Sequence, residues 1–314
     1  MSSTVCLPDV IITKEHRRFA EFCDACRRYG YIGLCYGTPG VGKTLSARHY
    51  AKWDQIEALP SRNKASDAEL AVLMDCHTVL YTPHVVNSPR QVAESIRMRR
   101  NHLQAIPLEV LHREEEALRA RLQDAASEQE FFFRALDAFH DPQFKKPERP
   151  ESKVYEVAKT YYKKREEMPE HTTLLLIDEA DRLKAASLEQ VRDIFDQGGM
   201  GVVLIGMPGL EKRLSRYPQL YSRVGFVHEF RPLSANEMRD LLCQKWAPPG
   251  VILPEEGFND EEVLATIIRI TGGNFRLLHR LMTQVARLVE INALSRITRA
   301  VVEAARESLV IGAV

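Results

Sequence analysis

Residues 37–44 of this 314-residue chain read Gly37-Thr38-Pro39-Gly40-Val41-Gly42-Lys43-Thr44. The stretch matches the pattern G-x-x-x-x-G-K-[ST] at every fixed position. A short apolar run at residues 31–36 precedes it and predicts a buried strand. A helical pattern at residues 45–53 follows it. The sequence therefore predicts a strand, a glycine-rich loop and a helix in succession, which is the context that the pattern requires.

The chemistry of this loop is that of phosphate binding. Its glycines allow backbone N–H groups to surround phosphate oxygens, and the helix that follows directs its positive end at them. Lys43 supplies a cation for the outer phosphates, and Thr44 offers a hydroxyl to Mg²⁺. We therefore predict that residues 37–44, together with Leu45, bind ATP and Mg²⁺.

A second motif lies at the end of another predicted strand. The apolar run Leu174-Leu175-Leu176-Ile177 is followed directly by Asp178 and Glu179. Ligands bind at the carboxyl ends of the strands in a parallel sheet. Asp178 is placed to hold Mg²⁺ through water, and Glu179 to orient and polarise an attacking water molecule. A protein that only binds phosphate has no need of Glu179, so this residue favours hydrolysis.

The remaining pattern predicts an α/β fold followed by a helical domain. Strands are predicted at residues 79–82, 202–205 and 226–230, and helices alternate with them. Continuous apolar strands of this kind favour a parallel five-stranded sheet that is covered on both faces. From Ser234 onward the pattern is helical, beginning with the capping box Ser234-Ala235-Asn236-Glu237. We predict an N-terminal helix and extension at 1–30, a nucleotide-binding domain at 31–233 and a helical lid at 234–314.

The nucleotide-binding domain carries more chain than its sheet requires. Residues 45–173 separate the first and third predicted strands, where two βα units need roughly 60 residues. The excess has apolar residues on one helical face, namely Leu111, Leu118, Leu122, Ala125, Phe132, Leu136 and Phe139. We predict a helical insertion at about 100–168, a hairpin or small bundle. It either packs on the flank of the sheet or serves as a partner-binding arm.

Composition excludes some classes of protein. The chain is 45% hydrophobic and its 43 basic residues balance its 43 acidic ones, so no overall basic field indicates nucleic acid. The sequence shows no secretory signal and no apolar stretch of about 20 residues, so we expect a soluble cytoplasmic protein without a membrane partner. Cys23 and Cys26 have the spacing of a zinc ligand pair, but their helical pattern favours buried core cysteines.

Two arginines complete the set of motifs, Arg223 in Ser222-Arg223 and Arg276 in Gly273-x-x-Arg276. With them, the chain resembles AAA+ ATPases of the initiator type. More narrowly, residues 174–183 and 201–210 resemble the transposition regulators of the MuB, TniB and TnsC group. The resemblance covers about residues 14–290, apart from the insertion.

The resemblance implies a protein that forms ATP-dependent homo-oligomers, rings or helical filaments, on duplex DNA. Such proteins recruit a transposase and influence target choice, so a target-selection protein is a further implied partner. Arg223 would be the finger that reaches the ATP of a neighbouring subunit, with Arg216 and Arg213 in reserve, and Arg276 would contact ATP in its own subunit. Gly206-Met207 stands where such proteins usually carry a polar sensor residue, which implies slow hydrolysis.

Duplex DNA is the implied partner for which the chain offers basic residues. Arg97, Arg99 and Arg100 form a basic cluster where the pore-facing DNA contacts of these proteins tend to fall. The alternative is a solvated helix face. Lys14, Arg17 and Arg18 form a second, weaker cluster. An oligomer repeats each patch, so neutral overall charge is compatible with salt-dependent DNA binding.

Two other functions remain open from the sequence. One is a helicase loader of the same fold, which would carry a helicase-binding segment at one terminus. The other is a nucleotide-switched interaction ATPase that binds ATP without forming oligomers on DNA.

Overall fold

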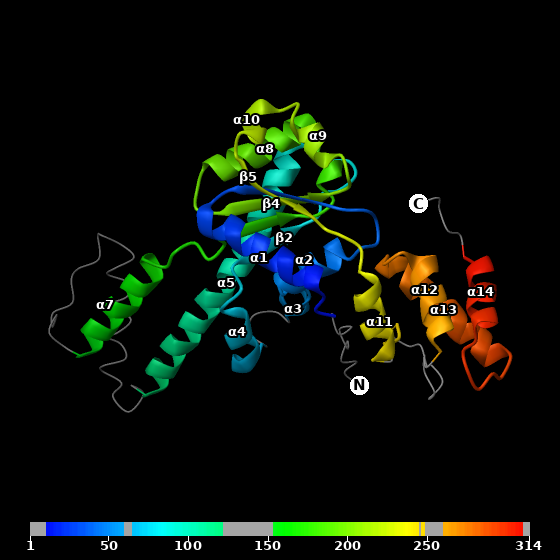
Figure 1. Ribbon diagram of the computed structural model, residues 1–314. Coiled ribbons are helices and arrows are strands. Elements are labelled where there is room, and N and C mark those ends of the chain that lie inside the picture. Colours follow the sequence, from blue (N-terminus) through cyan, green and yellow to red (C-terminus); the bar gives the residue numbers. More distant parts are fainter. Residues whose placement is uncertain (1–10, 60–64, 122–152, 245, 249–259, 310–314) are drawn as a thin grey trace. The chain divides into compact units, whose positions relative to one another are not determined.

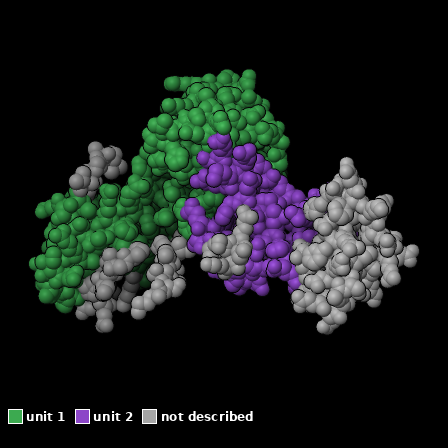
Figure 2. All heavy atoms as spheres, turned by 180° about the vertical axis from the view of Figure 1, so that it is seen from behind, with its two compact units in different colours: residues 1–54, 80–93, 174–314 green, residues 55–79, 94–173 purple. Residues whose placement is uncertain are grey.

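The computed structural model describes residues 11–59, 65–121, 153–244, 246–248 and 260–309. The chain divides into two compact units (Figure 2). The first comprises residues 1–54, 80–93 and 174–314, and the second comprises residues 55–79 and 94–173.

A five-stranded sheet organises the nucleotide-binding part of the chain. Its strands are β1 (Ile32–Tyr36), β2 (Thr78–Tyr81), β3 (Leu174–Ile177), β4 (Gly201–Gly206) and β5 (Val224–Glu229). Their order is β2-β3-β4-β1-β5, and β1 runs parallel to both β4 and β5, as β3 does to β4. Every residue of β3 and β4 is buried, whereas exposure alternates along the edge strand β5. The predicted α/β fold with a parallel five-stranded sheet is confirmed.

Helices lie on both sides of this sheet (Figure 1). Helix α1 (Lys14–Tyr29) begins after the Thr13 cap and ends at Gly30, whose φ of 62° is left-handed and suits glycine. It approaches the sheet closely, because a Cβ at Gly201 of β4 would lie 2.5 Å from the carbonyl oxygen of Cys26. Cys23 and Cys26 are fully buried in this contact. Burial raises the pKa of the Cys26 thiol to about 12, so both cysteines are apolar core residues here.

The segment after the phosphate-binding loop contains more helices than the sequence predicted. Helix α2 (Lys43–Tyr50) is followed by α3 (Trp53–Ala58) and α4 (Asp67–Leu73), and the sequence predicted neither of these two. A capping box marks the start of α4, where Ser66 and Glu69 exchange side-chain and backbone hydrogen bonds. That signal is present in the sequence as Ser-x-x-Glu.

Helix α5 (Pro89–Arg121) is one continuous helix of 33 residues with Pro107 inside it. The sequence predicted a separate helical insertion from about residue 100, whereas the helix continues through that position. Helix α7 (Lys153–Glu166) follows within the second unit. Of the apolar face predicted for the insertion, Leu122, Ala125, Phe132, Leu136 and Phe139 lie outside the described residues. The insertion and the domain boundaries therefore stay predictions.

Short helices connect the last three strands. The 3₁₀ turn η2 (Ala180–Arg182) follows β3 and leads into α8 (Ala185–Asp196). Between β4 and β5 lie α9 (Leu210–Leu214) and α10 (Pro218–Tyr221). In Figure 1, α8, α9 and α10 lie on the opposite side of the sheet from α1 and α2.

The chain after β5 forms helices with a core of their own. These are α11 (Ala235–Cys243), α12 (Glu261–Thr271), α13 (Phe275–Ile291) and α14 (Arg299–Glu307). The predicted cap Ser234 accepts a backbone hydrogen bond at the start of α11, and Asp260 and Asn274 do the same at the starts of α12 and α13. The side chains that these helices bury include Met238, Leu242, Ile267, Leu278, Met282 and Val302. Among the described residues, none of the helices combines the length and apolar character needed to span a membrane.

Candidate functional site: a nucleotide-binding pocket

The phosphate-binding loop (residues 37–44) connects β1 to α2, as predicted. Gly40 and Gly42 have φ values of 85° and 110°, which glycine adopts without the steric cost of a Cβ. Gly37 lies so close to the chain after β5 that a Cβ would be 2.3 Å from the carbonyl oxygen of Phe230. These positions therefore need glycine for two physical reasons, namely backbone conformation and close packing.

Lys43 folds back over this loop. Its Nζ donates hydrogen bonds to the carbonyl oxygens of Gly37, at 2.5 Å, and Thr38, at 2.9 Å. Partial burial lowers the pKa of Lys43, and the carboxylates of Asp178 and Asp181 act in the opposite direction. The ammonium group is thus held directly over the loop that is predicted to surround phosphate.

Asp178 and Thr44, the two residues predicted to bind Mg²⁺, are in direct contact. The Thr44 Oγ1 donates to Asp178 Oδ2 at 2.7 Å, and Asp178 is 3% exposed. A hydroxyl and a carboxylate are hard oxygen ligands of the kind that Mg²⁺ takes together with phosphate oxygens and water. This donor set fits the predicted ion, with Thr44 and Asp178 as the residues that would hold it.

Glu179 leaves β3 in a strained backbone conformation. Its φ of 52° lies in the left-handed region, which is uncommon for a residue with a Cβ. Its N–H donates to Asp178 Oδ1 at 2.9 Å, and its carboxylate forms an ion pair with Arg182. Arg182 also donates to the carbonyl oxygen of Pro83 at 3.1 Å. The carboxylate predicted to activate water is therefore half-exposed and paired with a neighbour on its own turn.

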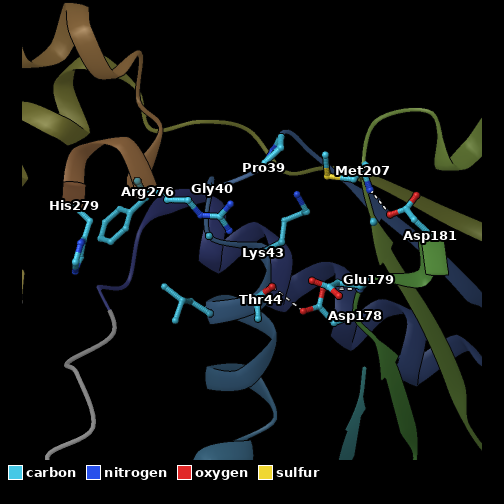
Figure 3. Close-up of a pocket in the computed structure, with 14 residues that line it drawn as sticks. Pro39, Gly40, Lys43, Thr44, Asp178, Glu179, Asp181, Met207, Arg276 and His279 are labelled. Atoms are coloured by element: carbon cyan, nitrogen blue, oxygen red, sulfur yellow. Dashed lines mark hydrogen bonds between the residues drawn. The ribbon is translucent and has the colours of Figure 1, made fainter. Parts of the chain in front are cut away.

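A pocket of about 390 Å³ joins these groups (Figure 3). Its lining includes most of the predicted site, namely Pro39, Gly40, Gly42, Lys43, Thr44, Leu45, Asp178, Glu179 and Arg276. Gly37, Thr38 and Val41 are not part of the lining, and Val41 is 5% exposed because its side chain packs into the core. Arg276 reaches the pocket from the start of α13, as its predicted role requires.

Sequence reasoning missed three residues of the lining, namely Asp181, Phe275 and His279. Gly206 and Met207, which the resemblance placed at the sensor position, also line the pocket. His279 follows Arg276 by one helical turn, so helical spacing could have found it. Asp181 had no such signal, because it lies in η2 and its partner, Met207, follows β4. Its Oδ2 accepts a hydrogen bond from the Met207 N–H at 2.8 Å. A Cβ at Gly206 would lie 2.4 Å from that oxygen, so glycine there gives the carboxylate room.

Arg223 lies outside this pocket. Its guanidinium is bound to Asp196 at the end of α8, with an Nη2–Oδ2 distance of 2.7 Å, and it donates to the carbonyl oxygen of Gln219. Of the reserve candidates, Arg213 donates to the carbonyl oxygens of Asp181 and Leu183 and so fixes the turn after β3. Arg216 is exposed. Arg213 is thereby committed to a structural contact within its own chain.

The basic cluster proposed for DNA lies on α5. Arg97 is exposed, whereas Arg99 donates to the Ser95 carbonyl oxygen and Arg100 pairs with Glu170, with an Nη2–Oε2 distance of 3.0 Å. The weaker cluster is also partly neutralised, because Arg18 pairs with Glu15. The structure leaves Arg97 as the most accessible of the three predicted DNA contacts.

Comparison with known proteins agrees with this geometry. Residues 26–214, more than half of the chain, match the family described as AAA domain. The chain belongs to this AAA domain family. A "Potential ATP-binding protein" of Staphylococcus aureus is 40% identical over 306 residues, which cover 96% of this chain and 97% of that relative. The family uses ATP with Mg²⁺, so the cofactor prediction is confirmed.

Solved structures show the same fold at low sequence identity. The ORC2 protein of Aeropyrum pernix, described in ADPNP–ADP complexes, is 14% identical and has a TM-score of 0.51. The match covers 98% of this AAA domain protein and 70% of that chain. A mutant RuvB of Thermotoga maritima is 15% identical with a TM-score of 0.50, covering 96% and 71% of the two chains. The AAA+ fold is thereby confirmed, while membership of the transposition-regulator group stays a prediction.

Proposed function

We propose that this AAA domain protein hydrolyses ATP, with Glu179 orienting the attacking water. The observation that carries this proposal is the convergence of Lys43, Thr44, Asp178 and Glu179 on one pocket. A site that only held phosphate would need the first three of these residues. Glu179 adds a carboxylate beyond the Mg²⁺ ligands, at the end of the strand where an attacking water would stand.

Each residue has a distinct part in this proposal. Lys43 exchanges the carbonyl oxygens of Gly37 and Thr38 for oxygens of the outer phosphates. Thr44 and Asp178 hold Mg²⁺, which neutralises charge on those oxygens when it is bound. Glu179 exchanges Arg182 for the water molecule. Arg276 donates to the phosphates from the lid, with the planar fork that suits a phosphoryl group.

The second half of the hydrolytic site is proposed to come from a neighbouring subunit through Arg223. The arginine lies on the turn before β5 and is bound to Asp196 in its own chain. A finger of this kind would exchange the Asp196 carboxylate for the γ-phosphate of the neighbour's ATP. Both ligands are anions that accept hydrogen bonds in pairs from a guanidinium, so the exchange conserves the contact geometry.

At the level of cellular role, we infer an ATP-dependent regulator of DNA transposition that acts in the cytoplasm. Support comes from residues 174–183 and 201–210, which resemble the MuB, TniB and TnsC group, and from the exposed Arg97. In this role, ATP joins subunits into a ring or filament on duplex DNA and the oligomer recruits a transposase. A target-selection protein would be a further partner. Hydrolysis then releases the subunits.

Electron microscopy with duplex DNA and a slowly hydrolysed ATP analogue tests this role. We expect rings or filaments that require both DNA and nucleotide. Oligomers that form with nucleotide alone, or a protein that stays monomeric, would contradict it and favour the nucleotide-switched interaction ATPase. A helicase loader would also bind DNA, so the decisive addition is a transposase from the same genetic element, whose strand-transfer activity the oligomer should stimulate.

A further inference from the structure

The lid is bound to the phosphate-binding loop by the turn between α12 and α13. In this turn, the Asn274 Nδ2 donates to the carbonyl oxygen of Pro39 at 2.7 Å. Two residues later, the backbone N–H of Arg276 donates to the carbonyl oxygen of Gly40 at 3.0 Å. Two consecutive carbonyls of the loop are therefore held by two nearby donors of the lid.

The contact is close enough to depend on glycine. A Cβ at Gly40 would lie 2.5 Å from Asn274 Oδ1 and 2.7 Å from Arg276 Cβ. On its other side, the turn is fixed to the chain that leads into the lid, because the Leu233 N–H donates to the Gly273 carbonyl oxygen at 3.0 Å. Gly273 also has a left-handed φ of 78°. The turn is thus constrained from both sides.

Asn274 has two functions that can be separated. Its Oδ1 accepts a hydrogen bond from the Leu277 N–H at 3.2 Å and so caps α13. Its Nδ2 makes the bond to Pro39. Capping needs an acceptor, which serine and aspartate also provide, whereas the bond to Pro39 needs a donor with the reach of an amide. A serine or aspartate at this position would cap α13 but would not donate a hydrogen bond to Pro39.

The direction of these carbonyls determines the direction of the N–H groups that can bind phosphate. In a planar trans peptide the C=O and the N–H point in opposite directions, and the described residues contain no cis peptide bond. Holding the Pro39 carbonyl toward the lid therefore turns the Gly40 N–H away from the lid. Holding the Gly40 carbonyl does the same for the N–H of Val41. Asn274 and Arg276 thus orient two donors of the phosphate-binding loop.

We propose that Asn274 is a positioning residue that sets the Pro39–Gly40 peptide plane for phosphate binding and thereby couples nucleotide occupancy to the position of the lid. This inference rests on the nucleotide site described above. Coupling of this kind is reciprocal: if the docked lid favours phosphate binding, bound phosphate favours the docked lid by the same factor.

The test compares Asn274→Ser with wild type. Serine keeps a neutral cap for α13 but is too short to reach Pro39, so the unfolding temperature of the nucleotide-free protein should fall less than in Asn274→Ala, which loses the cap as well. The Kd for Mg²⁺–ADP and for a slowly hydrolysed Mg²⁺–ATP analogue, measured by calorimetry, should rise about fivefold, as expected for one lost hydrogen bond. In amide hydrogen exchange, nucleotide should protect α12 and α13 in wild type and much less in the variant.

A matched control is available at the other end of α13. Asn292 donates through Nδ2 to the Leu288 carbonyl oxygen at 2.8 Å, away from the pocket. Asn292→Ser makes the same chemical change and should leave both Kd values and the protection of the lid as in wild type. Asn274→Ala should weaken binding like serine and also lower the unfolding temperature, because it removes the cap.

The outcomes separate this inference from the nucleotide site itself. If Asn274→Ser binds both nucleotides within twofold of wild type, the assigned role of Asn274 is overturned while the site stands. Equal weakening in Asn292→Ser would also overturn it, because the effect would then be one of lid stability. A wild-type protein that fails to bind either nucleotide would instead contradict the ATP site, and the inference would fall with it.

Discussion

Glu179 combines a strained backbone with the chemistry proposed for the site. Its φ of 52° costs on the order of 1 kcal/mol relative to a right-handed conformation. The fold maintains this conformation through the hydrogen bond from its N–H to Asp178 and the ion pair with Arg182. Strain of this kind is found at sites where a side chain must be held in one direction. At Glu179, the side chain lines the pocket and pairs with Arg182.

Glu179→Gln should keep nucleotide binding and lose hydrolysis. Glutamine preserves size and hydrogen bonding but does not polarise water, so the turnover rate should fall at least about 100-fold, the lower range for loss of a general base. Phosphate release and nucleotide affinity are the two measurements. Lys43→Ala is the companion variant and should abolish binding. Unchanged turnover in Glu179→Gln would remove it from the proposed mechanism.

His228 predicts how stability depends on pH. Burial lowers its pKa, while Glu15, 4.0 Å from Nε2, acts in the opposite direction. A histidine whose pKa is lower in the folded state binds protons more readily when unfolded. Its contribution to stability is therefore complete above the unfolded pKa of about 6.5 and is lost as the pH falls toward the folded pKa.

We therefore expect the urea concentration at the midpoint of unfolding to decrease as the pH is lowered from 7.5 to 5.5. His228 packs beside Phe19, Phe22 and Phe230, so phenylalanine is a suitable uncharged replacement. The His228→Phe variant should lose less stability over this range than wild type. Since burial also lowers the pKa of His16, part of the pH dependence should remain in the variant. An identical pH dependence in the two proteins would exclude His228 as a source.

At the scale of elements, the lid depends on local signals at the starts of its helices. Ser234 and Glu237 form a capping box in which each side chain accepts the backbone N–H of the other residue. The buried side chains of α11 then pack into the core of the lid. The cap and the apolar face both favour a helix that begins at the same residue. Agreement between a local capping signal and tertiary packing favours a single native structure.

Ser234→Ala should lower the free energy of unfolding by about 1 kcal/mol, the usual cost of a lost serine cap. Ser215→Ala is the matched control, since Ser215 is exposed and its hydroxyl donates to the carbonyl oxygen of Lys212, three residues earlier. It should change stability by less than about 0.5 kcal/mol. Denaturant titrations of the two variants provide the comparison. Equal effects would show that the capping box contributes nothing of its own.

At the scale of the whole molecule, the residues that line the pocket all come from one chain. Lys43, Asp178, Glu179 and Arg276 all line it. Arg223 lies elsewhere and is bound to Asp196, and hydrogen bonding with Arg223 lowers the pKa of that carboxyl group. In the function that we propose, Arg223 exchanges Asp196 for the ATP of a neighbouring subunit.

Mixing two inactive variants tests whether Arg223 acts on a neighbour. Arg223→Ala lacks the finger and Glu179→Gln lacks the water-orienting carboxylate, so each alone should hydrolyse ATP slowly. A mixed oligomer contains sites with Glu179 from one chain and Arg223 from the next, and its turnover should recover. Absence of recovery, with both variants still able to bind ATP and assemble, would identify Arg223 as a structural arginine.

The sequence by itself determined the parts of this protein that depend on local order. The phosphate-binding loop, the carboxylates after β3, the buried strands and the capping box at Ser234 were all predicted, because each follows from neighbouring residues along the chain. Capping and strand periodicity act over a few residues. The missed helix α4 had such a signal as well, in Ser66 and Glu69.

Tertiary structure alone decided what distant residues do to one another. No local pattern indicates that Asp181 binds the Met207 N–H or that Arg223 is held by Asp196. The bond from Asn274 to Pro39 joins residues 235 positions apart. Such contacts arise only when the sheet order brings strand ends together and the lid folds back to the loop. The sequence predicted the residues of the nucleotide site, and the long-range contacts determine how those residues are held.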